Sequence, residues 1–187
     1  MQKINFKFSP HLKVAKILIK NFLKDDFLAI DATLGNGFDS LFLSDILKNG
    51  QVFSFDIQKE AIENSKKYLK DKKNITFFLA SHEDFSKHIF KKVQFIIYNL
   101  GYLPGSDKKI VTKSSSTIKS INSALDILDE IGAICITAYP GHEEGLKEEK
   151  KILKFLETLN YKKFSVSYQK WINKKNAPSL FWIEKKY

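Results

Sequence analysis

The sequence predicts an α/β fold, a doubly wound sheet that is mostly parallel and has one antiparallel strand at its C-terminal end. Short apolar runs, typical of buried strands, alternate along the 187 residues with amphipathic stretches typical of helices. Near the C-terminus apolar and polar residues alternate strictly, which indicates a hairpin. The length suits one domain, 1–187, with an N-terminal helical segment at 1–24 and a core at 27–187.

Each element is predicted from its local pattern. The five apolar runs predicted as parallel strands are 27–32, 51–56, 74–79, 93–99 and 133–139. Gly132 is expected to open the last of them. Apolar residues at helical spacing predict helices over 12–23, 61–69, 118–128 and 146–159. The predicted hairpin pairs the alternating segment 164–168 with the apolar run 180–183.

The charge balance favours an anionic partner. The formal net charge is +10 and the pI is about 9.4, and clustered positive charge is what contacts to phosphate require. However, all 31 basic residues are lysine, and an AT-rich genome would impose the same bias without selection for binding. Nucleic acid is therefore the first candidate partner, with compositional bias as the alternative.

Composition also excludes several classes of protein. No run approaches the roughly 18 consecutive apolar residues of a membrane helix, and the first ten residues lack the apolar stretch of a secretion signal. The only cysteine, Cys135, cannot form an internal disulfide, and the four histidines show no zinc-finger spacing. We therefore expect a cytoplasmic protein that needs neither membrane nor metal, with Cys135 packed inside a strand.

The strongest motif is a glycine turn after the first predicted strand. Residues 30–37 read Ile-Asp-Ala-Thr-Leu-Gly-Asn-Gly, in which Gly35 and Gly37 allow positive φ and close approach of a ligand to the backbone. The next helix then presents its N-terminus to that ligand. Asp56 ends the second strand, where a carboxylate accepts hydrogen bonds from the hydroxyls of a ribose. Together these motifs predict a nucleoside cofactor, with a plain tight turn and a helix cap as the alternative.

A dinucleotide cofactor fits this turn less well. Its fingerprint is Gly-x-Gly-x-x-Gly, and the third glycine is missing because 38–40 reads Phe-Asp-Ser. The carboxylate of Asp31 would also repel a pyrophosphate, whereas it suits the ammonium group of a methionine moiety.

These residues resemble the motifs of the class I S-adenosylmethionine-dependent methyltransferases, which have a Rossmann-like sheet. Asp31, Gly35 and Gly37 look like their first motif, and Asp56 looks like their second. Thr33 stands where that first motif has its earliest glycine. Four segments together resemble the narrower YtqB-type group, namely 31–37, 55–64, 99–105 and 139–142.

The YtqB-type group, long labelled as rRNA methylases, is associated with a tRNA modification. Its activity is methylation of the 5-aminomethyl group of wobble uridine, often 2-thiolated (5-aminomethyl-2-thiouridine), and the enzyme of this activity is called MnmM. The resemblance covers about 27–183, nearly the whole chain. It implies S-adenosyl-L-methionine as the cofactor and the anticodon loop of tRNA as the substrate.

The resemblance also implies which residues bind the cofactor. They are Asp31, Gly35, Asn36, Gly37, Asp39, Asp56, Ile57, Ser81, His82 and Asn99. The turn and Asp39 are expected at the methionine end, Asp56 at the ribose and Ile57 on the adenine. His82 is expected at the adenine edge, with a solvent-exposed loop histidine as the alternative.

Three residues are expected at the reacting amine: Asn99, Tyr102 and His142. Related amine methylases have Asn-Pro-Pro-Tyr or Asp-Pro-Pro-Tyr where this chain has Asn-Leu-Gly-Tyr at 99–102. An amine that donates to the Asn99 oxygen keeps its lone pair aimed at the methyl group; a strand-end cap is the alternative for Asn99. Because an ammonium has no lone pair, we consider His142 as a base. Contact with RNA and bracing of its loop are the alternatives.

Two loops expected at the carboxyl edge of the sheet are rich in RNA-binding side chains. The candidates are Lys108, Lys109, Thr112, Lys113, Trp171, Lys174 and Lys175. Lysine and threonine contact phosphate, and tryptophan offers a face on which a base stacks.

Other functions are left open by the sequence. One is a methyltransferase that acts on rRNA or on a small amine, and another is a non-catalytic RNA-binding protein with a Rossmann-like core. The sequence also leaves open which tRNAs are used, whether 2-thiolation is required, whether the chain forms a homodimer, and which group accepts the amine proton.

Overall fold

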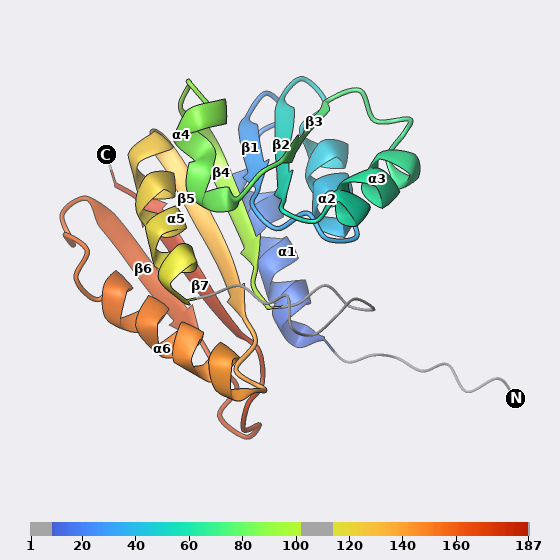
Figure 1. Cartoon of the computed structure of the whole chain (residues 1–187). Helices are drawn as coiled ribbons and strands as arrows, with labels where there is room; N and C mark the ends of the chain where they lie inside the picture. The colour runs from blue at the N-terminus through green and yellow to red at the C-terminus, as the bar shows by residue number, and fades with distance from the viewer. Residues whose placement is uncertain (1–8, 102–113, 187) are drawn as a thin grey trace, which may run out of the picture.

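A seven-stranded sheet forms the centre of the computed structural model, which describes residues 9–101 and 114–186 (Figure 1). In the described residues the strand order is β3-β2-β1-β4-β5-β7-β6. The strands are β1 (Leu28–Asp31), β2 (Gln51–Asp56), β3 (Ile75–Leu79), β4 (Val93–Asn99), β5 (Leu128–Ala138), β6 (Phe164–Gln169) and β7 (Ser179–Lys185).

Helices connect these strands along the chain. They are α1 (Pro10–Phe22), α2 (Phe38–Ile46), α3 (Lys59–Tyr68), α4 (Phe85–His88), α5 (Ser114–Ile127) and α6 (Glu143–Leu156), with a short 3-10 turn η1 (His82–Asp84). Among the described residues, no helix has the length and apolarity needed to cross a membrane.

The strand pairing confirms the predicted fold class. The pairs formed by β1, β2, β3, β4 and β5 are parallel, and β7 pairs antiparallel with both β5 and β6. The antiparallel C-terminal strand therefore lies one place in from the edge. Burial explains this order, because β7 is buried along most of its length and needs a partner on each side, whereas β6 is mostly exposed and suits an edge.

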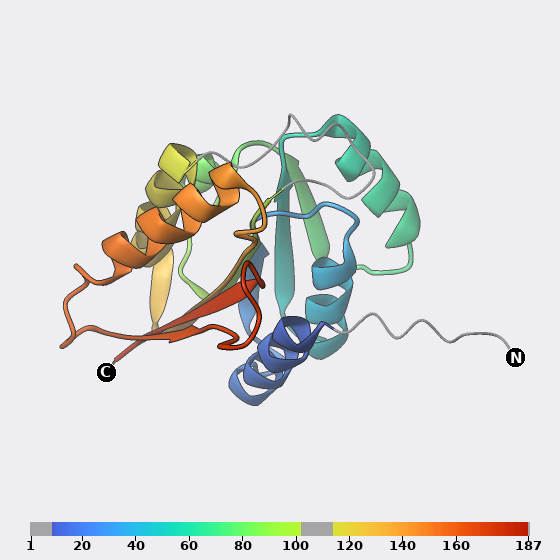
Figure 2. The ribbon, with the colours of Figure 1, turned by 90° about the horizontal axis from the view of Figure 1, so that it is seen from below.

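Helices cover both faces of the sheet, as expected of a doubly wound fold. Ile19 of α1 and Leu43 of α2 pack on one face, in a cluster that also holds the buried Cys135. Ile121 of α5 and Ile152 of α6 pack on the other face. Figure 2 shows α1 and α6 on opposite sides of the sheet. Burial raises the pKa of the Cys135 thiol, so this residue packs in the core as expected.

The boundary between α5 and β5 differs from the prediction. Leu128 was expected at the end of a helix and Gly132 at the start of a strand, but α5 ends at Ile127 and both residues lie inside β5. Leu128 pairs with Val93, and the register then shifts before Phe95 pairs with Ala133. Leu128 is buried, and a buried apolar residue at this spacing is expected in a helix as well as in a strand, so the spacing could not separate the two. Similarly, α6 ends at Leu156, so the predicted helix over 146–159 is shorter at its C-terminal end.

The carboxyl ends of the parallel strands share one edge of the sheet with the loop at 170–178. Asn99 at the end of β4 is level with Thr137 of β5, and Ala138 is level with Ser179 at the start of β7. The loop between β6 and β7 thus returns to this carboxyl edge, as predicted.

Candidate active site

The glycine turn has the backbone conformation that the sequence predicts. Gly35 and Gly37 have φ of 50° and 77°, a region that residues with a Cβ rarely adopt. A Cβ on Gly37 would also lie 3.0 Å from Oγ of Ser65 and 3.1 Å from Cδ1 of Leu69, both on the α3 side. The turn is therefore closely packed, and it leads directly into the N-terminus of α2.

Asp56 at the end of β2 holds this turn in place. Its Oδ2 accepts a hydrogen bond of 2.9 Å from the backbone N–H of Gly35, and its Oδ1 accepts one of 2.9 Å from that of Gln58. Each carboxylate oxygen has lone-pair capacity for a further donor. The neighbouring Ile57 side chain is 60% exposed. A partly exposed carboxylate beside an exposed apolar side chain fits the ribose and adenine of a nucleoside.

Asp31 lies deeper than the sequence suggested. Its side chain is fully buried, and its carboxyl group accepts hydrogen bonds from Oγ of Ser40 (2.6 Å) and from the N–H of Thr33 (3.2 Å). Burial, followed by repulsion from Asp39, raises its pKa to about 7. Asp31 therefore supports the glycine turn from inside the protein. On a bound cation it would act by electrostatic attraction.

Asn99 is fixed by three neighbours at the end of β4. Its Nδ2 donates to Oδ2 of Asp39 (3.0 Å), and its Oδ1 accepts a hydrogen bond of 2.7 Å from the hydroxyl of Tyr139. Its backbone N–H donates to Oγ1 of Thr33 at 2.7 Å. Burial raises the pKa of the Asp39 carboxyl. The structure thus brings Asn99 and Asp39 together beside the glycine turn.

Two residues of this network were not selected from the sequence. Thr33 was noted only as a departure from the glycine of the first motif, yet its hydroxyl links the turn to β4. Tyr139 begins the segment 139–142, in which only His142 is expected at the reacting amine. Neither spacing nor composition gives a signal for them, because their partner Asn99 is 66 and 40 residues away.

His82 is not an exposed loop histidine. Its ring packs edge-on against Tyr98 with centroids 5.9 Å apart, and burial lowers its pKa to about 4. Its Nδ1 is buried without a hydrogen-bond partner among the described atoms. Ser81 accepts a hydrogen bond from the N–H of Glu83 and so caps the η1 turn. A neutral ring whose Nδ1 has no partner among the described atoms suits a hydrogen bond to the polar edge of a ligand bound near the end of β3.

His142 acts as the cap of α6. Its Nδ1 accepts a hydrogen bond of 3.0 Å from the N–H of Gly145. The neutral ring therefore carries its proton on Nε2, and the Nδ1 lone pair cannot accept a proton without loss of the cap. A Cβ on Gly145 would lie 2.2 Å from the carbonyl oxygen of Tyr139, so this first turn packs tightly against the end of β5. This geometry supports a role for His142 in bracing its loop.

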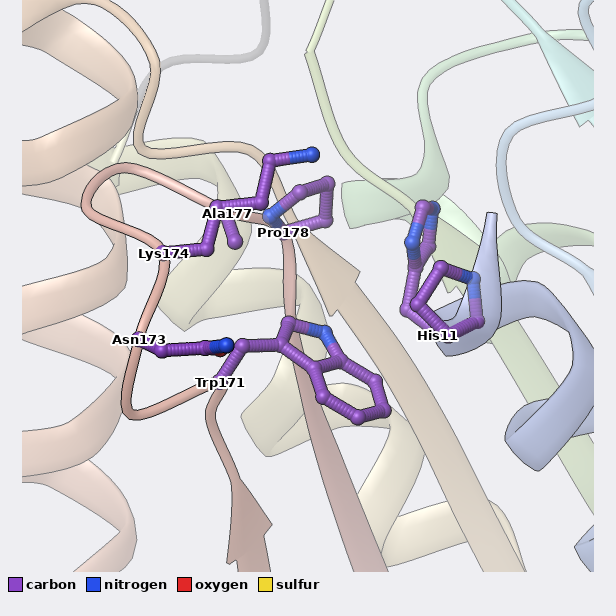
Figure 3. A pocket seen from close by; sticks show the side chains of 7 residues that line it. His11, Trp171, Asn173, Lys174, Ala177 and Pro178 are labelled. Atoms are coloured by element: carbon purple, nitrogen blue, oxygen red, sulfur yellow. The ribbon is translucent and has the colours of Figure 1, made fainter. Parts of the chain in front are cut away.

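The predicted RNA-binding residues fall into two groups. The first group, Lys108, Lys109, Thr112 and Lys113, lies outside the described residues. The catalytic candidate Tyr102 lies outside them as well. The second group, Trp171, Lys174 and Lys175, belongs to the loop between β6 and β7 at the carboxyl edge. Trp171 and Lys174 line a pocket there, opposite the start of α1 (Figure 3). In the described part of the chain, no group of three or more potential metal-ligand side chains comes together.

This sheet order, with a glycine turn after β1 and a carboxylate from β2 that binds the turn, defines the class I S-adenosylmethionine-dependent methyltransferases, and this chain is one of them. The family model described as "Putative rRNA methylase" matches residues 52–185, and the chain belongs to that family.

Individual relatives agree with this assignment. A structure from Clostridium thermocellum with the same rRNA methylase description superimposes with a TM-score of 0.91 at 37% identity, covering 96% of this chain and 100% of that one. A methyltransferase from Streptococcus mutans, solved in complex with SAH, gives a TM-score of 0.86 at 31% identity, covering 95% and 99%. The chloroplastic tRNA (mnm(5)s(2)U34)-methyltransferase of Arabidopsis thaliana is 29% identical over 93% of this chain and 69% of its own length.

Proposed function

We propose that this enzyme methylates the amine of the 5-aminomethyl group on wobble uridine of tRNA, 5-aminomethyl-2-thiouridine 34, in the cytoplasm. The observation that carries the proposal is the Asn99 amide, held between Tyr139 and Asp39 beside the glycine turn. The tRNA target is supported by the Arabidopsis relative, whose name specifies that position. S-adenosylmethionine, when bound, supplies an electrophilic methyl group.

The proposed cofactor contacts follow the carboxyl edge of the sheet. Asp56 binds the ribose hydroxyls with the lone pairs that Gly35 and Gln58 leave available. The exposed side chain of Ile57 packs on the adenine, and His82 lies at the adenine edge. The methionine end lies over the turn formed by Gly35, Asn36 and Gly37, with the charges of Asp31 and Asp39 beneath its ammonium group.

The target amine is oriented by Asn99 in this proposal. A carbonyl oxygen accepts two hydrogen bonds, and Tyr139 occupies one acceptor position of Oδ1. The amine donates to the other and keeps its lone pair directed at the methyl group, so the contribution of Asn99 is alignment.

The proton of the substrate ammonium must leave before the amine can attack. Asp39 is the described group best suited to accept it, because it contacts Asn99 and because burial raises its pKa, which strengthens it as a base. His142 is less suited because its Nδ1 caps α6.

Nucleoside mass spectrometry on tRNA from cells with and without the gene tests the proposal. We expect the deletion strain to accumulate a wobble uridine lighter by one CH2, restored by the wild-type gene and not by Asn99→Ala. Unchanged tRNA nucleosides would contradict the tRNA target.

A second candidate substrate is rRNA, because the family model carries that description. The same measurement on rRNA distinguishes it: a ribosomal nucleoside that loses a methyl group in the deletion strain, with tRNA unchanged, would favour rRNA.

A further inference from the structure

We propose that the pocket between the start of α1 and the loop at 170–178 binds a nucleotide adjacent to the methylated one in the substrate RNA. This inference rests on the proposed function, since it requires an RNA substrate. Trp171, Pro178 and Ala177 provide apolar walls, His11 closes the opposite side, and Lys174 lies at the rim (Figure 3).

The side chains of this pocket suit a nucleotide. The indole of Trp171 is partly exposed and offers a stacking face, which binds any base. The ring of His11 is buried, and burial together with the charge of Lys174 lowers its pKa, so it adds no charge to the apolar wall at neutral pH. Lys174 is exposed and makes no ion pair with a described residue, which leaves it available for a phosphate.

The loop that forms the pocket is held in position at both ends. Buried Glu149 of α6 accepts hydrogen bonds from Nζ of Lys170 (3.2 Å) and from Oγ of Ser179 (2.5 Å), which flank the loop. The sequence of this loop, from 170 to 178, contains three lysines and no acidic residue. Since Lys170 is paired with Glu149, the charge available to a ligand comes from Lys174 and Lys175. A preformed, positively charged loop matches the backbone of single-stranded RNA.

The position of the pocket indicates a neighbouring nucleotide. The ring of His11 packs edge-on against Tyr139 at 5.8 Å between centroids, and the hydroxyl of Tyr139 binds Asn99. Tyr139 therefore stands between the pocket and the site of methyl transfer. The strands that carry Asn99 and Ser179 are two places apart in the sheet, which is roughly 10 Å at the usual strand spacing. The contacts through Tyr139 thus place the pocket close enough to Asn99 for a neighbouring nucleotide to reach it.

The test measures RNA binding with three versions of an anticodon stem-loop that carries 5-aminomethyl-2-thiouridine. One is intact, and each of the others has an abasic site on one side of the target. Fluorescence anisotropy is measured for the wild type, Trp171→Ala, Trp171→Phe, Lys174→Ala and the control Tyr161→Ala/Lys162→Ala. The control removes an exposed aromatic and an exposed lysine from the turn that precedes β6, at the opposite edge of the sheet. SAH binding confirms that each variant is folded.

We expect Trp171→Ala to weaken binding of the intact stem-loop about tenfold, because stacking on an aromatic side chain is lost. Trp171→Phe and the control should stay close to the wild type, and Lys174→Ala should weaken all three RNAs with a smaller salt dependence. On one of the two abasic RNAs, wild type and Trp171→Ala should bind equally.

Two results would overturn the proposed role of the pocket. One is undiminished binding of the intact RNA by Trp171→Ala. The other is that Trp171→Ala binds both abasic RNAs more weakly than the wild type, by the same factor as it does the intact RNA. Methyl transfer by the wild type separates the two proposals. Absence of transfer to the intact stem-loop contradicts the proposed function, whereas transfer together with unaffected binding by Trp171→Ala contradicts the pocket alone.

Discussion

The hydroxyl of Tyr139 donates a hydrogen bond of 2.7 Å to Oδ1 of Asn99, and this bond fixes which way the amide faces. Burial raises the pKa of Tyr139 to about 12, so the hydroxyl keeps its proton and remains a donor at neutral pH. With Oδ1 toward Tyr139, Nδ2 is directed at Asp39. Orientation of a reacting group depends on such supporting bonds, because a small displacement lowers the rate without loss of binding.

We expect Tyr139→Phe to lower kcat about tenfold, which corresponds to the loss of one hydrogen bond that positions Asn99. The dissociation constant for SAH should stay within about twofold, since Tyr139 does not contact the glycine turn in the described hydrogen bonds. Steady-state methylation and calorimetry measure the two quantities. Tyr161→Phe is the matched control, because it removes a tyrosine hydroxyl from an exposed residue before β6, away from the site. Equal kcat for Tyr139→Phe and wild type would contradict the positioning role.

Asp56→Ala and Asn99→Ala should affect different steps. Asp56→Ala should raise the cofactor dissociation constant about tenfold or more, because it removes both the proposed ribose contact and the bond to Gly35. Asn99→Ala should instead depress methyl transfer while SAH binding stays nearly intact. Calorimetry with SAH and single-turnover methylation compare the two variants. Equal losses in both assays for both variants would show that the two roles are not separate.

Thr33→Val tests the link between the glycine turn and β4. Valine has nearly the same shape but cannot accept the hydrogen bond from the Asn99 N–H. We expect the free energy of unfolding to fall by about 1–2 kcal/mol, the typical cost of a buried donor left unpaired. Thr33→Ser keeps the hydroxyl and serves as the control. Chemical denaturation measures both, and equal stability of Thr33→Val and Thr33→Ser would mean that the hydroxyl contributes nothing.

Asp31 makes the stability of the protein depend on pH. Its pKa is about 7 in the folded state and about 4 in an unfolded chain, so between these values the folded protein binds more protons. The free energy of unfolding should therefore fall as pH rises from about 4 to 7 and level off above. Asp31→Asn removes this contribution, so its stability relative to wild type should increase from pH 5 to pH 8, by on the order of 1–4 kcal/mol.

Thermal or urea unfolding at several pH values measures this difference. Asp26→Asn, at an exposed carboxylate before β1, is the control and should show no such trend. A constant difference between Asp31→Asn and wild type across pH 5–8 would mean that Asp31 is ionised throughout.

His142→Asn distinguishes a helix cap from a general base. Asparagine is a good N-cap, so the variant should keep its stability and the start of α6. We expect the pH profile of methyl transfer to keep its shape, because the Nδ1 lone pair serves the cap. Asp39→Asn should slow transfer more strongly if Asp39 accepts the proton. A collapse of transfer in His142→Asn with intact SAH binding would restore His142 as the base.

Local patterns in the sequence predicted most strands of the sheet and the conformation of the glycine turn. The strands 51–56 and 93–99 were predicted with the bounds that the structure has, because a buried parallel strand is a near-continuous apolar run and each of these two ends in a polar residue. The turn at Gly35 and Gly37 was equally readable, since its positive φ values depend on residues next to each other in the chain.

Only the tertiary structure decided how the surroundings of Asn99 are built. The bonds of Asn99 to Thr33, Asp39 and Tyr139 join residues 66, 60 and 40 positions apart. The packing of His11 against Tyr139 joins the first helix to the end of β5. Such contacts depend on strand register and on the packing of helices against the sheet, and no local pattern of residues encodes them. The sequence by itself therefore determined the fold class and a glycine turn suited to a nucleoside, whereas long-range packing decided that Tyr139 orients Asn99.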